Sequence, residues 1–152
     1  MKGDMEVTKI LPFDIKYIDD IYGIELDSFS IPWSKDSLEK DAIENKMSIY
    51  LVALEDEKVV GYAGMWHVVT EGHITNVAVS PDFRRRGIAD MLLTELTNIA
   101  VKKEMIGITL EVRMNNVAAQ GLYLKHGYKV EGIRKNYYSD TKEDAIIMWK
   151  YL

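Results

Sequence analysis

Apolar side chains recur at helical spacing in four parts of the chain. One helix is predicted over residues 14–29, and a second follows Ser34, which is a favourable N-cap residue, and runs to Ile43. The most regular pattern covers residues 86–103, where one stripe contains Ile88, Met91, Leu92, Leu96, Ile99 and Ala100. A short fourth helix begins after Asn115 or Asn116 and ends at the C-cap signal His126-Gly127.

Strand-like segments separate these helices. Alternating or β-branched runs predict strands over residues 5–11, 47–54, 59–69, 73–80, 106–113, 128–133 and 144–152. The polar turn at residues 55–58 indicates a hairpin. The predicted order is β-αα-β-β-β-α-β-α-β-β. This order indicates a single α/β or α+β domain, residues 1–152, with a mixed sheet and helices on its faces.

Composition narrows the classes of function. The net charge of −5 argues against direct binding to nucleic acid and suits a basic partner instead. The absence of cysteine excludes disulfides, cysteine-based zinc sites and a cysteine nucleophile, and the three histidines lack metal-ligand spacing. We see no signal peptide and no apolar run near the ~20 residues that span a bilayer. We therefore expect a cytoplasmic protein with no metal and no membrane partner.

The segment Arg84-Arg85-Arg86-Gly87-Ile88-Ala89 joins a predicted strand to the longest helix. Free N–H groups and the helix dipole favour an anion at such a helix start, and Gly87 lets a bulky group approach the backbone. The segment lacks the spaced glycines of the dinucleotide fingerprint and the Lys-Ser/Thr of the P-loop. Alone, it indicates either a phosphate site or a helix start with solvated arginines.

Five further segments of the chain contain motifs that accompany this loop: residues 74–79, 110–116, 121–128, 134–138 and 143–148. Together with residues 84–89 they resemble, over residues 7–152, the GNAT superfamily of acetyl-CoA-dependent N-acetyltransferases. Within it they are most similar to the bacterial ribosomal-protein-alanine N-acetyltransferases. The resemblance implies a mixed, mostly antiparallel seven-stranded sheet flanked by about four helices, and often a monomer.

The resemblance also implies roles for individual residues. Backbone groups of Val77, Ala78 and Val79 would hold the pantetheine arm of acetyl-CoA, and one N–H would polarise the thioester carbonyl. Glu111 would be the general base and Tyr123 the general acid. The remaining cofactor contacts would come from Arg84, Arg85, Arg86, Gly87, Ile88, Ala89, Asp90 and Asn116. The acceptor would be bordered by Phe29, Trp33, Asn76, Tyr137 and Tyr138.

Two positions in the pyrophosphate loop depart from the commoner pattern. Ala89 replaces a second glycine, which the family allows. Asp90 places a carboxylate where a basic or neutral residue is usual, and this bears on cofactor affinity.

The chemistry is consistent with these roles. An amine must be neutral to attack a thioester, and deprotonation at pH 7 costs roughly 1 kcal/mol for a protein α-amine but about 4.6 kcal/mol for lysine. Glu111 shares its strand with Ile108, Leu110 and Val112, and apolar neighbours predict a raised pKa for its carboxyl group. It could act directly or through a water. Tyr123 could then protonate the departing thiolate without a covalent enzyme intermediate.

Structural explanations compete with some of these roles. Tyr123 could be a core aromatic, and Glu111 could pair with Arg113, which shares its strand face. Trp33 could pack in the core or line the acceptor site. Tyr137 and Tyr138, paired aromatics in a polar loop, favour a recognition surface.

The leading hypothesis is acetyl transfer from acetyl-CoA to a protein N-terminal α-amine, that of an alanine on a small-subunit ribosomal protein. Ribosomal proteins are basic, which suits the acidic chain. One alternative is acetylation of a small-molecule amine or a protein lysine. Another is a non-catalytic acyl-CoA-binding module, against which the combination of Glu111 and Tyr123 argues.

Overall fold

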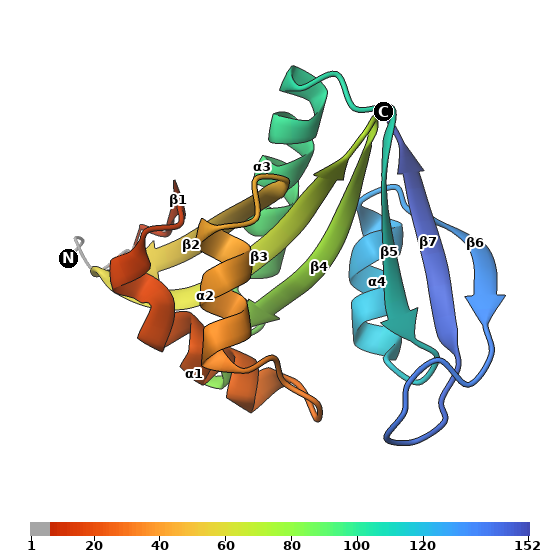
Figure 1. The fold of residues 1–152 in the computed structure, drawn as a ribbon, viewed down its shortest axis with the longest axis horizontal. Helices are drawn as coiled ribbons and strands as arrows, with labels where there is room; N and C mark the ends of the chain where they lie inside the picture. The colour runs from red at the N-terminus through yellow and green to blue at the C-terminus, as the bar shows by residue number, and fades with distance from the viewer. Residues whose placement is uncertain (1–6) are drawn as a thin grey trace.

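Seven strands form one mixed sheet (Figure 1). The structure, a computed structural model, describes residues 7–152. The strand order of the sheet is β1-β2-β3-β4-β5-β7-β6, and every neighbouring pair is antiparallel except β4 and β5. This confirms the predicted mixed, mostly antiparallel sheet. The strands are β1 (Lys9–Pro12), β2 (Ser48–Glu55), β3 (Lys58–Val68), β4 (Glu71–Val79), β5 (Gly107–Arg113), β6 (Lys129–Arg134) and β7 (Ala145–Tyr151).

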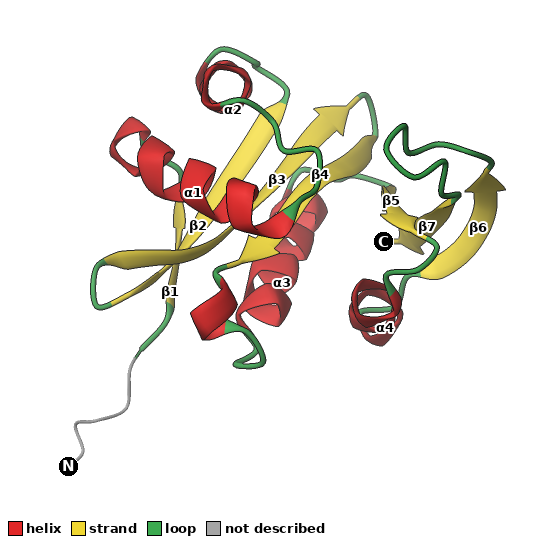
Figure 2. Cartoon of the chain, turned by 90° about the horizontal axis from the view of Figure 1, so that it is seen from below, coloured by secondary structure: helices red, strands yellow, loops and turns green. Residues whose placement is uncertain are grey.

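Helices cover both faces of the sheet: α1 and α2 lie on one face, α3 and α4 on the other (Figure 2). Ser34 caps α2, since its Oγ accepts the N–H of Ser37 at 3.1 Å. Asn116 caps α4 in the same way, accepting the N–H of Ala119 at 3.1 Å. The helices are α1 (Ile18–Ser28), α2 (Lys35–Ile43), α3 (Ile88–Lys102) and α4 (Val117–Lys125).

Most strands end within one or two residues of their predicted bounds, the first begins later, at Lys9, and two predicted helices start differently in the structure. The predicted helix over residues 14–29 begins as a short 3-10 turn, Ile15–Tyr17, before α1. Helix α3 starts at Ile88 and not at residue 86, because Arg85 and Gly87 have left-handed backbone angles (φ 64° and 78°) that no helix contains. Residues 5 and 6 of the first predicted strand lie outside the described residues.

Each face of the sheet has its own apolar core. The face under α3 buries Leu92, Leu93 and Leu96 completely, whereas Met91, predicted in the apolar stripe, is 37% exposed. The opposite face packs Ile21 of α1 and Leu38 of α2 against the sheet. The two cores hold the sheet between paired helices and so fix the position of its central strands.

Strands β4 and β5 separate after a short parallel contact. They pair only from Glu71–Gly107 to His73–Thr109 and then diverge, as Figure 1 shows. Along the rest of β4, one edge still pairs with β3 while the other faces the gap. After His73, this edge of β4 therefore has no strand partner within the described sheet.

None of the helices in residues 7–152 has the length and apolar character needed to cross a membrane.

Candidate active site

A cleft of about 500 Å³ opens beside the free edge of β4, between the start of α3 and helix α4. Much of the predicted site lines it. The predicted residues on its wall are Phe29, Val77, Ala78, Val79, Arg84, Arg85, Gly87, Ile88, Ala89, Asp90, Asn116 and Tyr123. The wall does not include Trp33, Asn76, Arg86, Glu111, Tyr137 or Tyr138.

The edge of β4 presents backbone hydrogen-bonding groups to this cleft. The N–H of Ser80 donates to the Val60 carbonyl at 2.8 Å, so Ser80 faces β3. Because successive residues alternate in an antiparallel pair, Val77 and Val79 direct their N–H and C=O groups away from β3. An extended ligand in the cleft could therefore hydrogen-bond to β4 as an additional strand would.

The start of α3 is suited to an anion. Its N-cap is Gly87, which has no side chain to cap the first turn, so the N–H groups of Ile88, Ala89 and Asp90 stay available. Arg84 ties this loop to the strand, because its Nε donates to the Val79 carbonyl at 3.0 Å. The cleft thus combines a strand edge with an anion-binding helix start.

Arg86 has a different position from its two neighbours. Its guanidinium pairs with Glu55, 3.2 Å from Oε1, and lies 4.9 Å from the centre of the Phe83 ring. Glu55 is buried and also accepts the Thr8 hydroxyl at 2.8 Å. The three arginines are therefore not one cluster, and Arg86 connects the loop to the end of β2.

The carboxylate of Asp90 is neutralised from α4. One oxygen, Oδ1, lies 2.7 Å from Lys125 Nζ and 2.8 Å from His126 Nε2. The hydrogen bond from Lys125, followed by that from His126, lowers the pKa of Asp90 below its usual value. These contacts join the C-terminal end of α4 to the start of α3 beside the cleft.

Tyr123 is buried in the cleft wall, with 8% of its surface exposed. Its ring meets that of Tyr128 edge-on, with centroids 5.6 Å apart. Burial, with a smaller contribution from Tyr138, raises the pKa of Tyr123 to about 12. No hydrogen bond within residues 7–152 involves its hydroxyl, which leaves the phenol proton available to a ligand.

The prediction that apolar groups surround the Glu111 carboxylate is wrong. Its strand neighbours Leu110 and Val112 point into the core that contains Tyr123, so Glu111 points to the other face of the sheet. There its Oε2 lies 2.9 Å from Arg134 Nε, and its side chain is 33% exposed. Its ion-pair partner is Arg134, while Arg113 pairs with Asp140 and Glu143.

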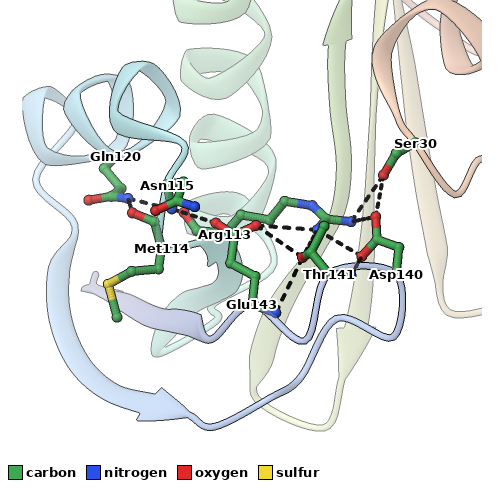
Figure 3. Close-up of polar contacts among 8 residues, drawn as sticks. All are labelled: Ser30, Arg113, Met114, Asn115, Gln120, Asp140, Thr141 and Glu143. Atoms are coloured by element: carbon green, nitrogen blue, oxygen red, sulfur yellow. Dashed lines mark hydrogen bonds and ion pairs between the residues drawn. The ribbon is translucent and has the colours of Figure 1, made fainter.

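Tyr137 and Tyr138 lie in the β6–β7 loop, residues 135–144, next to the end of β5. Their rings meet edge-on with centroids 5.1 Å apart. The Arg113 guanidinium stacks 4.0 Å from the centre of the Tyr138 ring and also bonds to Asp140 and Ser30, a network drawn in Figure 3. The tyrosines thus belong to a structured loop.

Asn76 and Trp33 meet at a buried carboxylate that the sequence interpretation missed. Glu25 is 1% exposed and accepts hydrogen bonds from Asn76 Nδ2 at 3.1 Å, from the Trp33 N–H at 2.8 Å and from the Tyr62 hydroxyl. The signal for Glu25 was available: it follows Ile18 and Ile21 at helical spacing, on the apolar face of α1.

Ser28 is a second residue that the sequence interpretation missed. It lines the cleft beside Phe29, and its hydroxyl is buried without a hydrogen-bond partner among the described residues. A buried hydroxyl of this kind gains from a ligand that can pair with it. Within residues 7–152, no group of three or more His, Asp or Glu side chains is placed to hold a metal.

Comparison with known proteins agrees with this geometry. The family model described as "Acetyltransferase (GNAT) family" matches residues 18–128. The chain belongs to the GNAT acetyltransferase family. A GNAT relative from Bacillus subtilis is 43% identical over 132 residues, covering 87% of each chain. The ribosomal protein bS18-alanine N-acetyltransferase of Salmonella typhimurium is 36% identical over 127 residues, covering 82% of this chain and 84% of the relative.

Solved structures of N-acetyltransferases match the fold. The crystal structure of the ribosomal-protein-S18-alanine N-acetyltransferase from Escherichia coli has a TM-score of 0.88 and 30% identity, covering 95% of this chain and 94% of that chain. An N-acetyltransferase of Thermoplasma acidophilum, solved in complex with coenzyme A, has a TM-score of 0.76 and 19% identity, covering 96% and 99% of the two chains. The latter likeness shows the shared fold.

Proposed function

We propose that this protein transfers the acetyl group of acetyl-CoA to the N-terminal alanine of ribosomal protein bS18. The observation that carries the proposal is the cleft in which the free edge of β4, the uncapped start of α3 and the buried Tyr123 phenol meet. The names of the curated relatives supply the acceptor. The proposed location is the cytoplasm, where ribosomal proteins are made.

The cleft fits acetyl-CoA as the donor substrate. Val77 and Val79 offer backbone partners to an amide-containing arm, and the first turn of α3 offers N–H groups to a pyrophosphate. Asn116 lines the cleft at the start of α4, where its Oδ1 is already used to cap that helix. Asp90 does not repel the phosphates as a free carboxylate would, because the Lys125 ammonium pairs with it and His126 also bonds to it.

The two proposed catalytic residues lie on opposite faces of the sheet. Tyr123 lies on the side of α3 and α4, and Glu111 points to the other side. A thioester in the gap between β4 and β5 would then be reached by the acceptor amine from the side of Glu111. Tyr123 would protonate the sulfur that leaves on the opposite side, which separates the base from the acid.

The acceptor chemistry favours an α-amine. Its deprotonation at pH 7 costs roughly 1 kcal/mol, against about 4.6 kcal/mol for a lysine side chain. Glu111 is partly exposed, so the amine or a water molecule can reach its carboxylate, and Arg134 holds that carboxylate in place. Such a base suffices for an α-amine.

Steady-state kinetics with matched acceptors tests the proposal. The acceptors are a basic peptide with a free N-terminal alanine, the same peptide with a blocked N-terminus and an internal lysine, and a polyamine. We expect the free alanine peptide to have a kcat/KM at least ~100-fold above the other two. A polyamine or the blocked peptide as the best acceptor would contradict the proposal. Binding of acetyl-CoA without turnover of any acceptor would identify a non-catalytic module instead.

A further inference from the structure

Ser30, Arg113 and Asp140 form a hydrogen-bonded group that we call the clasp. The Ser30 hydroxyl donates to Asp140 Oδ2 at 2.6 Å. Arg113 bonds to both oxygens of Asp140, each at 3.0 Å, and its Nη2 also lies 3.3 Å from the Ser30 hydroxyl. Charge-assisted, bidentate contacts of this kind fix geometry more tightly than a single ion pair.

The clasp joins segments that are far apart in the chain. Ser30 lies in the α1–α2 segment, residues 29–34, Asp140 in the β6–β7 loop and Arg113 at the end of β5 (Figure 3). Ser30 and Asp140 are 110 positions apart, so their bond can form only in the folded chain. It holds the α1–α2 segment against the β6–β7 loop, across the two halves of the divided sheet.

The β6–β7 end of the clasp is itself anchored. Glu143 Oε2 accepts the N–H of Asn115 at 2.6 Å, and Glu143 Oε1 lies 3.4 Å from Arg113 Nη1. Arg113 stacks on Tyr138, and the side chains of Arg113 and Asp140 are only 26% and 22% exposed. The β6–β7 loop is therefore anchored at Asn115 and Arg113, and the clasp connects it to Ser30.

Both ends of the clasp adjoin the wall of the cleft. Ser30 directly follows Ser28 and Phe29, which line the cleft on one side. Asn115, held by Glu143, directly precedes Asn116, which lines it on the other side. Arg113 and Glu111 share a strand face, so the clasp lies on the side from which the acceptor approaches.

We propose that the clasp fixes the width of the acceptor opening and thereby makes the enzyme select a small first residue. This inference rests on the proposed function. With the clasp closed, the α1–α2 segment and the β6–β7 loop are held together, so a chain end with a small side chain enters and a branched one meets both walls. Ser30, Arg113 and Asp140 are positioning residues in this account, since they set the walls and do not contact the reacting atoms.

Substitution of the clasp tests this with two peptides that differ only in their first residue, alanine or leucine. Ser30→Ala removes the bond to Asp140, and Asp140→Asn weakens the contacts with Arg113. For each variant we expect the ratio of kcat/KM for the alanine peptide over the leucine peptide to fall by at least ~5-fold. The KM for acetyl-CoA should stay within about twofold of the wild-type value.

Two controls separate selectivity from general damage. Ser139→Ala changes an exposed serine next to Asp140 in the same loop and should leave the ratio unchanged. Ser30→Thr keeps the hydroxyl and should retain most of the wild-type ratio of kcat/KM for the alanine peptide over the leucine peptide. If the wild-type enzyme acetylates the alanine peptide but the alanine-to-leucine ratio is unchanged in Ser30→Ala and Asp140→Asn, the inference about the clasp is overturned and the proposed function stands. A wild-type enzyme inactive on both peptides would overturn the proposed function.

Discussion

Tyr123 combines burial with a hydroxyl that pairs with no other described residue. A core tyrosine usually satisfies its hydroxyl within the protein, and here the Tyr128 hydroxyl is also without a partner, so burial alone does not identify a catalytic group. The distinction lies in position. Tyr123 lines the cleft, whereas Tyr128 is 1% exposed in the core behind it.

Replacing Tyr123 with phenylalanine tests its proposed role as the acid. The ring and its packing against Tyr128 remain, while the proton for the leaving thiolate is lost. We expect kcat to fall by about 100-fold or more and the affinity for acetyl-CoA to change little. Calorimetric binding together with steady-state rates checks this, and equal losses of affinity and turnover would remove Tyr123 from the chemistry.

The pH dependence of turnover follows from the same residue. Because burial raises the pKa of Tyr123 to about 12, the phenol stays protonated at neutral pH and ionises only in strong alkali. A phenol of ordinary pKa would cause kcat to decline near pH ~10, and we expect no such decline. Profiles of kcat up to about pH 11 provide the measurement. A decline centred near pH ~10 that disappears in Tyr123→Phe would contradict the account.

At the scale of elements, Glu25 joins α1 to the two central strands β3 and β4. Its carboxylate accepts hydrogen bonds from Tyr62 on β3, Asn76 on β4 and the backbone of Trp33. Tyr62, Asn76 and the start of the segment that leads into α2 are thereby held from inside the protein. Asn76 and Trp33 contribute to this support, and neither lies on the cleft wall.

Removal of Glu25 should destabilise the fold strongly. Glu25→Ala leaves the Tyr62 hydroxyl, the Asn76 amide and the Trp33 N–H without their partner in a buried region. We expect the free energy of unfolding to fall by about 3 kcal/mol, against about 1 kcal/mol for Tyr62→Phe, which removes one hydroxyl and leaves the Asn76 and Trp33 bonds to Glu25 in place. Urea denaturation of both variants measures the difference. Losses of equal size would show that the carboxylate does not hold the three groups together.

The start of α3 depends on the backbone angle of Gly87. With φ at 78°, a side chain there is strained even though an added Cβ would meet only Asp90 Oδ2, at 3.9 Å. Gly87→Ala should cost about 1–2 kcal/mol and shift the N–H groups of the first turn of α3, which are proposed to bind the pyrophosphate. We expect acetyl-CoA to bind roughly tenfold more weakly. Titration calorimetry tests this, with Gly23→Ala as a control because Gly23 lies in open space.

Across the whole molecule, the sequence predicted what local pattern and contiguous motifs can carry. The order of elements follows from apolar spacing. Arg84, Arg85 and residues 87–90 lie together in the cleft because they are close in sequence at one helix start. The partner of Ser30 could not be predicted, since it lies 110 positions away. The surroundings of Glu111 were misjudged because strand alternation says which residues share a face, but not what covers that face.

The acidic charge of the whole chain agrees with a basic acceptor, although charge alone does not choose between an α-amine and a lysine. Site-resolved mass spectrometry of intact bS18 with a free N-terminal alanine, incubated with the enzyme and acetyl-CoA, separates them most directly. The account predicts one acetyl group, on the N-terminal alanine, with the lysines unmodified. Acetylation of lysines with a free N-terminus, or no acetylation of bS18, would contradict it.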